Sequence, residues 1–369
     1  MVCVALQLGG LRRSPFNVFG LALAAAGFGA ITNALALGQI ALPVAAAVAI
    51  SYAATRFGGK VLAATAAFAQ PNLALALAGE FRRKNTALAL IAAVALFALV
   101  CAGVSANGIL AYALVLAAHA TAEQFSAIQL TPAAIAYGFG APAGIALAIG
   151  GATAAAALLL WLRAMVRFED RLTLFVISCA LVPFGAAFFH QHDLVILFVP
   201  AIALVLRAPV TVLPLAMSGA LLCATNWIGL AQNPEATVQT LLLTGAFALA
   251  LLALRGDFAY RELAVPAAIL LLVTATGISA STHVLPVWPD AMGTLPPHVA
   301  ALSAAAAWHA EQIATGLFTR HAFWSVLRCA SLAGCVLLAY AAYRSAESLK
   351  AQDPGLARAV RSPEAELTQ

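Results

Sequence analysis

The chain has 369 residues, of which 63% are hydrophobic and only 9% are charged, and its formal net charge is +5. A mean hydropathy of +0.97 excludes a water-soluble globular domain, since too few polar side chains remain to cover its outside. The basic residues form short clusters between apolar runs, which is typical of the inner loops of a multi-pass membrane protein and argues against nucleic-acid binding. The six Cys lie inside apolar runs without metal-ligand spacing, and we interpret them as buried apolar residues.

The first ten residues are apolar and precede Arg12 and Arg13, which is the reverse of a signal peptide. Ten residues reach about 15 Å as a helix, or half a bilayer. We therefore interpret this stretch as the second half of a spanning helix and expect a complete version of the chain to carry further residues upstream.

Alternating passes of the apolar runs through a bilayer predict an all-α, polytopic transmembrane helix bundle. Residues 1–345 are expected to supply ten to eleven membrane segments, and 346–369 a polar cytoplasmic tail that is disordered beyond about Asp353. The simple spans are predicted at 16–32, 39–55, 85–106, 142–162, 172–189, 194–206, 210–229, 236–254, 263–278 and 323–343. Segments 107–141 and 281–322 are expected outside, and the predicted location is the plasma (inner) membrane with a cytoplasmic C-terminus.

The segment 61–80 does not fit a simple span, because it starts beside Lys60 and ends at Glu80 next to Arg82. Gln70 and Pro71 stand at its midpoint, where proline removes a backbone donor and breaks a helix. We predict two half-helices that enter the membrane and return to the same side. The alternative is an ordinary span that violates the charge rule.

Charge is sorted between the two predicted faces. Of the 19 Lys and Arg residues, all but Arg320 and Arg328 fall on the inner side. All seven His residues fall at or near the outer side, together with five acids: Glu123, Asp193, Glu235, Asp290 and Glu311. Polar groups near membrane depth are costly, so the outer face is where we expect function.

The run His190-Gln191-His192-Asp193 is the sharpest candidate site. Imidazoles can bind phosphate oxygens and a carboxylate can accept a proton from an attacking hydroxyl. We expect no cofactor. A divalent metal is possible but is not supported by the spacing, because on a regular helix His190, His192 and Asp193 cannot all point one way. The alternative reading is a polar helix cap followed by a solvated loop.

The other candidates are weaker. Glu123, Gln124 and Ser126 lie in an otherwise apolar outer stretch, and Gln39 opens a span at the outer surface. Arg320 and Arg328 are candidates to pair with a lipid phosphate, or with an acid such as Glu311. The tryptophans Trp288, Trp308 and Trp324 fit interfacial anchors, with stacking on a sugar ring as the alternative.

In this order, the motifs resemble glycosyltransferase family 87, also filed as domain of unknown function 2029. Gly38-Gln39 matches a Gly-Gln that opens a span, and Gln70-Pro71-Asn72 stands where the family has Lys-Pro-Gln. Residues 123–126 loosely match an Asn-Gln-Ser motif, and the segment from Pro183 through His190 and His192 resembles Ser-Pro followed by Trp-X-His-His. The resemblance covers roughly residues 15–210.

The resemblance implies a GT-C-like fold with an outward-facing active site. It implies transfer of a sugar, such as mannose or arabinofuranose, from a polyprenyl-phosphate donor to a glycan or lipid acceptor. The family's inferred base is an Asp in the first outer loop, which here would precede Met1.

We therefore expect a membrane glycosyltransferase. Its donor would be held by His190, His192 and Arg320 near Gln39, Gln124 and Ser126, and Asp193 or Glu123 would accept the proton. The alternatives are a transporter or flippase of a lipid-linked or small polar substrate, and a truncated, noncatalytic homologue. Almost no charge lies within the spans, which counts against ion-coupled transport.

Overall fold

The computed structural model describes residues 1–282 and 303–352, and every regular element within these residues is a helix. Five are long and apolar enough to cross a membrane: α7 (Lys84–Val104), α10 (Ala143–Arg167), α15 (Thr237–Arg255, preceded by η3, Pro234–Ala236), α16 (Ala264–Ser281) and α18 (Ala322–Gln352). A sixth is obtained if α2 (Pro15–Gly27) and α3 (Gly29–Ala36), which meet at 66°, count as one broken span. The predicted all-α, multi-pass character is confirmed for the described residues.

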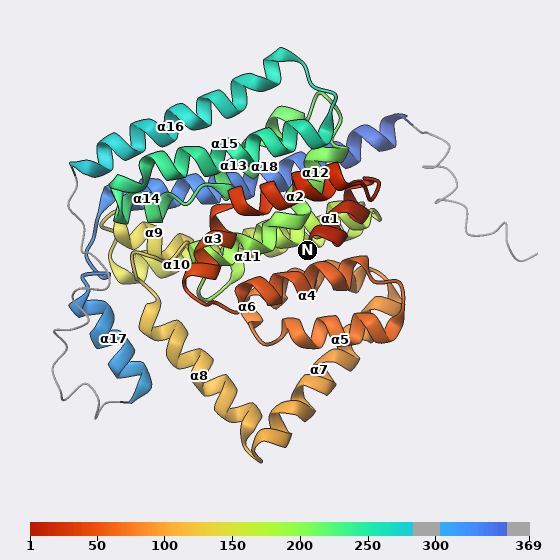
Figure 1. Cartoon of the computed structure of the whole chain (residues 1–369). Helices are drawn as coiled ribbons and strands as arrows, with labels where there is room; N and C mark the ends of the chain where they lie inside the picture. Colours follow the sequence, from red (N-terminus) through yellow and green to blue (C-terminus); the bar gives the residue numbers. More distant parts are fainter. Residues whose placement is uncertain (283–302, 353–369) are drawn as a thin grey trace, which may run out of the picture.

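The centre of the bundle is built from three shorter helices that the long ones surround (Figure 1). These are α11 (Arg171–Gly185), α12 (Phe198–Arg207) and α13 (Leu213–Ala224), and most of their residues are buried. The sequence 198–206 is apolar on every face, so either other helices or lipid must surround α12, and here most of its side chains are buried by other helices. α18 packs along α11 and α13, and α15 packs along α2.

Two helices stand away from the bundle and form a V, α7 and α8 (Gly108–Glu123) (Figure 1). Much of α7 and α10 is exposed, and the large apolar side chains that they expose are leucine, isoleucine and valine, as a lipid-facing surface requires. α8 returns the chain toward the bundle and contacts α17 (Ala304–Ala314). The segment 107–141, predicted as outer loop, thus contains α8 and the short α9 (Pro132–Gly138).

The predicted pair of half-helices is present. After α4 (Ala41–Ala53), the chain forms α5 (Phe57–Ala67), breaks at Gln70, and continues through α6 (Pro71–Ala74) and η1 (Leu75–Arg82). The buried amine of Lys60 forms an ion pair with Glu80, which Arg171 also contacts at 3.2 Å. Because Lys60 lies in the first turn of α5 and Glu80 near the end of η1, the hairpin returns to the side where it began.

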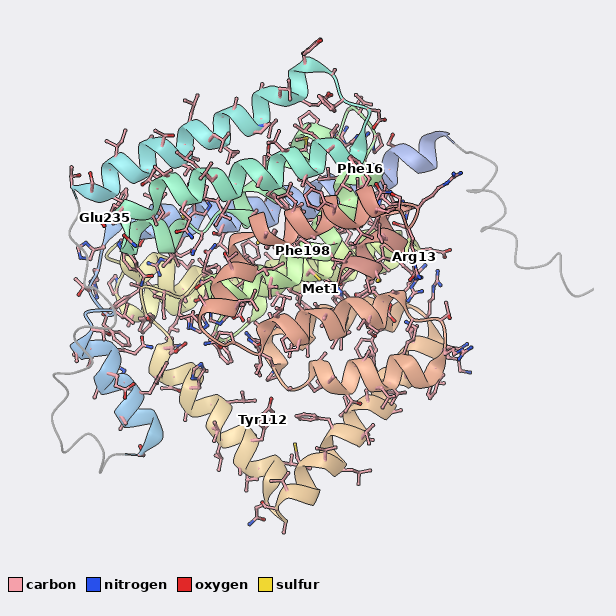
Figure 2. All side chains as sticks on the ribbon, in the orientation of Figure 1. Met1, Arg13, Phe16, Tyr112, Phe198 and Glu235 are labelled. Atoms are coloured by element: carbon pink, nitrogen blue, oxygen red, sulfur yellow. The ribbon has the colours of Figure 1, made fainter. Side chains whose placement is uncertain are left out.

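The remaining described helices are α1 (Val2–Gly9), η2 (Gln191–Leu197), α14 (Trp227–Gln232) and η4 (Tyr260–Leu263). Arg13 and Glu235 lie at opposite ends of the bundle (Figure 2), which agrees with the predicted sorting of charge. Several predictions concern residues outside the described ranges: the positions of His283, Trp288, Asp290 and His298, and the tail 353–369.

Candidate functional site

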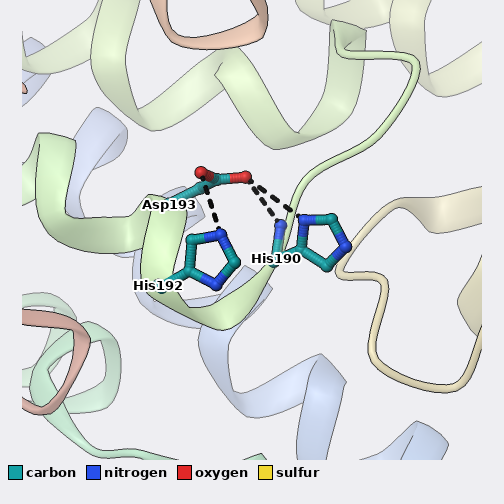
Figure 3. Close-up of side chains that lie close together, drawn as sticks. All are labelled: His190, His192 and Asp193. Atoms are coloured by element: carbon teal, nitrogen blue, oxygen red, sulfur yellow. Dashed lines mark hydrogen bonds and ion pairs between the residues drawn. The ribbon is translucent and has the colours of Figure 1, made fainter. Parts of the chain in front are cut away.

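The His190–Asp193 run forms the start of η2, a tight helix that follows the extended residue His190 (Figure 3). The backbone N–H of His190 donates to Asp193 Oδ2 at 2.9 Å. With three residues per turn, this helix places Asp193 directly over His190. Both residues, together with His192, are buried at the junction between α11 and α12.

Asp193 lies between two imidazoles. His190 Nδ1 is 3.6 Å from Asp193 Oδ2, and His192 Nε2 is 3.7 Å from Asp193 Oδ1. The two rings stack with centroids 5.0 Å apart and planes only 11° apart. One donor atom of each residue falls within 4.8 Å of the other two. The three side chains do point one way, contrary to the prediction from regular-helix spacing, because the segment is a 3₁₀ turn and not an α-helix.

The tip of the half-helix hairpin supplies the other partners of Asp193. Gln70 Nε2 donates to Asp193 Oδ1 at 2.6 Å, and Asn72 Nδ2 donates to Asp193 Oδ2 at 3.2 Å. Asn72 also donates to the Phe188 carbonyl at 3.3 Å. Pro71 places both carboxamides there, because it ends α5 and starts a new helix in a different direction. Sequence reasoning took this bend as structural and missed its contact with the site.

Glu123, the last residue of α8, holds His190 from the opposite side. His190 Nε2 is 2.7 Å from Glu123 Oε2, which also accepts from Gln129 Nε2 at 2.6 Å. The other carboxylate oxygen of Glu123, Oε1, accepts from the indole N–H of Trp308 at 2.8 Å and from the Gln312 amide at 3.3 Å, both on α17. The order Glu123, His190, Asp193, His192 therefore forms one continuous row of acids and imidazoles.

Arg328 fixes the loop that follows Glu123. Its guanidinium is buried in α18 and donates to the carbonyls of Ser126 at 3.3 Å and Gln129 at 3.0 Å, and to the Ser325 hydroxyl at 2.9 Å. Its partners among the described residues do not include Glu311, the acid expected as an alternative from sequence. Arg328 thus positions Gln129, which in turn contacts Glu123.

The electrostatics of the row follow from its pairing. Burial alone would lower the pKa of His190, but its hydrogen bonds to Asp193 and Glu123 outweigh burial and raise that pKa to about 10. For Asp193 and Glu123, burial raises the pKa, but the bond from His190 reverses this and leaves both below their usual values. Burial lowers the pKa of His192, so this imidazole is the neutral member.

The two carboxylates are more enclosed than the imidazoles. Asp193 is 0% and Glu123 is 1% exposed, whereas the side chains of His190 and His192 are each 11% exposed. The imidazole edges are therefore the more exposed part of the row.

The other predicted site residues are placed differently. Gln39 is exposed in the connection between α3 and α4, and Gln124 is half-buried at the end of α8. Ser126 is fully buried, and its hydroxyl has no hydrogen-bond partner among the described residues. Arg320 is exposed, lies 4.3 Å from the Tyr137 ring centre and donates to the Gly140 carbonyl at 3.3 Å. The structure gives none of these four side chains a bond to the row of acids and imidazoles.

Trp308 was expected to anchor the chain at the interface, but its indole N–H binds Glu123. Trp324 is buried in α18 at 2% exposure. No sequence signal links Trp308 to Glu123, since they are 185 positions apart.

Comparison with protein-family models, with curated proteins and with solved structures finds no match to this chain.

Proposed function

We propose that this protein is a membrane glycosyltransferase that takes a sugar from a polyprenyl-phosphate donor and transfers it to a hydroxyl of a glycan or lipid acceptor. One observation carries the proposal. Three of the four segments on which the family resemblance rests, at 70–72, 123–126 and 190–193, supply side chains to one buried polar row. Their meeting across more than a hundred residues of chain supports a shared chemical task.

The position of the row suits a donor that moves within the membrane. The row lies where α8, α11, η2 and α17 meet, and the basic loop residue Arg13 lies at the opposite end of the bundle from Glu235 (Figure 2). We take the protein to lie in the plasma membrane. By the positive-inside rule, the Arg13 end and the C-terminus then face the cytoplasm. The chemistry then occurs on the extracytoplasmic side.

The roles within the row follow from exposure. His192 faces the donor phosphate with the ring nitrogen that does not point at Asp193, and an imidazole N–H stabilises a leaving phosphate. Both ring nitrogens of His190 face carboxylates, so His190 contributes positive charge beside the phosphate rather than a direct hydrogen bond. Asp193 and Glu123 are enclosed, so we assign them to orienting the two imidazoles and to keeping His190 charged, rather than to direct contact with the acceptor. The proton of the acceptor hydroxyl then passes to the leaving polyprenyl phosphate.

A transfer assay tests this proposal. Membrane vesicles that contain the protein are incubated with labelled polyprenyl-phosphate mannose or polyprenyl-phosphate arabinofuranose, and label in glycan and lipid fractions is counted. The His190→Ala, His192→Ala double variant is expected to lose transfer by roughly 100-fold or more, the scale of a lost acid–base or electrostatic group. His321→Ala, a histidine with no described contact to the row, is the matched control. Transfer undiminished in the double variant removes the proposed site.

A further inference from the structure

We propose that His190 Nδ1, His192 Nε2 and Asp193 bind one divalent transition-metal ion. The three residues provide two imidazole nitrogens and a carboxylate, with their ligand atoms within 4.8 Å of one another. In Figure 3 both rings turn a nitrogen toward the Asp193 carboxylate. Three protein ligands with a further position open is the usual arrangement of a catalytic zinc site.

The distances require only small adjustments. The His190 and His192 nitrogens lie 3.6 and 3.7 Å from the Asp193 oxygens. Two ligand atoms at about 2.1 Å from a tetrahedral ion are separated by about 3.4 Å. The two imidazole–carboxylate pairs are therefore close to ligand spacing, and a modest rotation of the stacked rings closes the remaining pair.

The surroundings are those that metal ligands need. A ligating histidine normally donates its other ring N–H to a carboxylate, which fixes the ring and its tautomer. His190 does this with Glu123, at 2.7 Å through Nε2, while Nδ1 faces Asp193. The Asp193 carboxylate is itself oriented by the amides of Gln70 and Asn72.

Unpaired oxygens beside Asp193 give an independent indication of a ligand. The same two carboxamides carry Gln70 Oε1 and Asn72 Oδ1, which are buried and accept no hydrogen bond from any described residue. Asn72 as a whole is only 6% exposed. Buried carbonyl oxygens normally have a donor, and a water molecule on the open position of the ion would be one.

The ligand set selects the class of ion. Two imidazoles and one carboxylate suit Zn²⁺, Co²⁺, Fe²⁺ or Mn²⁺, whereas Mg²⁺ and Ca²⁺ prefer oxygen ligands alone. If the proposed function holds, the open position on the ion would accept a phosphate oxygen of the donor. The positive charge of the ion would offset the negative charges of Asp193 and Glu123. That role rests on the proposed function, whereas the metal site itself does not.

Cobalt binding tests the site without any substrate. The full chain is purified in detergent, stripped with a chelator and titrated with Co²⁺, whose visible absorption reports a tetrahedral or five-coordinate N/O site. We expect one Co²⁺ per chain and at least a tenfold weaker affinity in His192→Gln and in Asp193→Asn. His321→Gln, the matched control, is expected to bind like the wild type.

The variants are compared only where circular dichroism and size-exclusion profiles match the wild type. His192→Gln is the decisive one, because among the described residues the side chain of His192 has only its contact with Asp193 and its stacking on His190 to lose. No Co²⁺ bound by the wild-type chain, or equal affinity in folded His192→Gln, overturns the metal site. Because the titration contains no donor lipid, its result is independent of the transfer assay: Co²⁺ binding without sugar transfer removes only the proposed function.

Discussion

Gln70 and Asp193, 123 positions apart, are joined by a hydrogen bond of 2.6 Å between the Gln70 amide and Asp193 Oδ1. A bond to a buried carboxylate contributes about 1.5–3 kcal/mol. We expect Gln70→Leu to lower the free energy of unfolding by that amount and to weaken the orientation of Asp193. Denaturant unfolding in detergent, followed by circular dichroism, measures it. Gln239→Ala, on the exposed side of α15, serves as control, and equal stability of the two variants contradicts the bond.

Arg328 is expected to be essential for the loop after Glu123. Arg328→Met removes donors from the Ser126 and Gln129 carbonyls, at a cost of about 1–3 kcal/mol for each buried acceptor left unpaired. Arg320→Met loses a cation–π contact with Tyr137 and a hydrogen bond to the Gly140 carbonyl, both exposed and each worth about 1 kcal/mol or less. The thermal unfolding midpoints of the two variants provide the comparison, and a drop as large for Arg320→Met as for Arg328→Met speaks against this reading.

The half-helix hairpin is expected to depend on Lys60 and Glu80. Lys60→Met leaves Glu80 with Arg171 alone, and breaking a buried pair typically costs about 3–5 kcal/mol. Removing both charges, in Lys60→Met with Glu80→Leu, is expected to recover much of that loss, because the charge left without its partner is that of Arg171, whose side chain is part-exposed. A double-mutant cycle on unfolding free energies measures the coupling. Additive effects of the two changes contradict the closed hairpin.

The crossing of α2 and α15 depends on Gly27. A Cβ there would lie 2.6 Å from the Leu243 carbonyl oxygen and 2.7 Å from the Phe247 nitrogen, and backbone cannot yield as a side chain can. Gly27→Ala is therefore expected to destabilise the protein by about 1–3 kcal/mol. Gly245→Ala, on the same α15 but with no atom within 4 Å, is expected to stabilise it slightly through helix propensity. Opposite signs in thermal unfolding confirm the close crossing, and a harmless Gly27→Ala excludes it.

Orientation is tested by labelling intact cells with a membrane-impermeant maleimide. In a background without native cysteines, Glu235→Cys is expected to react and Arg13→Cys to react only after permeabilisation. The two positions lie at opposite ends of the bundle (Figure 2), so they report opposite faces. The reverse pattern would place the His190–Asp193 row in the cytoplasm and would refute the extracytoplasmic reaction.

The sequence was sufficient for what depends on local composition and charge. The apolar runs and the basic clusters predicted the helical bundle, and Pro71 with the charges at Lys60 and Glu80 predicted the hairpin. The 66° bend between α2 and α3 was not predicted, because no proline marks the break. The only local change is Phe28 with a glycine on each side, inside a run that is otherwise apolar and helical in pattern.

The site was only half visible from the sequence. His190, His192 and Asp193 are adjacent in the chain, so their clustering could be read directly. The bonds from Gln70, Trp308 and Arg328 depend on how distant helices pack, and each of these residues had a reasonable local role as bend, interface anchor or lipid partner. Spacing rules for a regular helix also failed at η2, because its turn has three residues rather than 3.6.

The pairing of Glu123 with α17 has a consequence for biogenesis. Trp308 is made 185 positions after Glu123, and at about 5–20 residues per second the ribosome needs roughly 10 to 40 s to reach it. Throughout that interval the nascent chain carries a carboxylate that lacks its indole and carboxamide donors from α17. The insertion machinery, or water at the membrane surface, must solvate this carboxylate until the late helix docks.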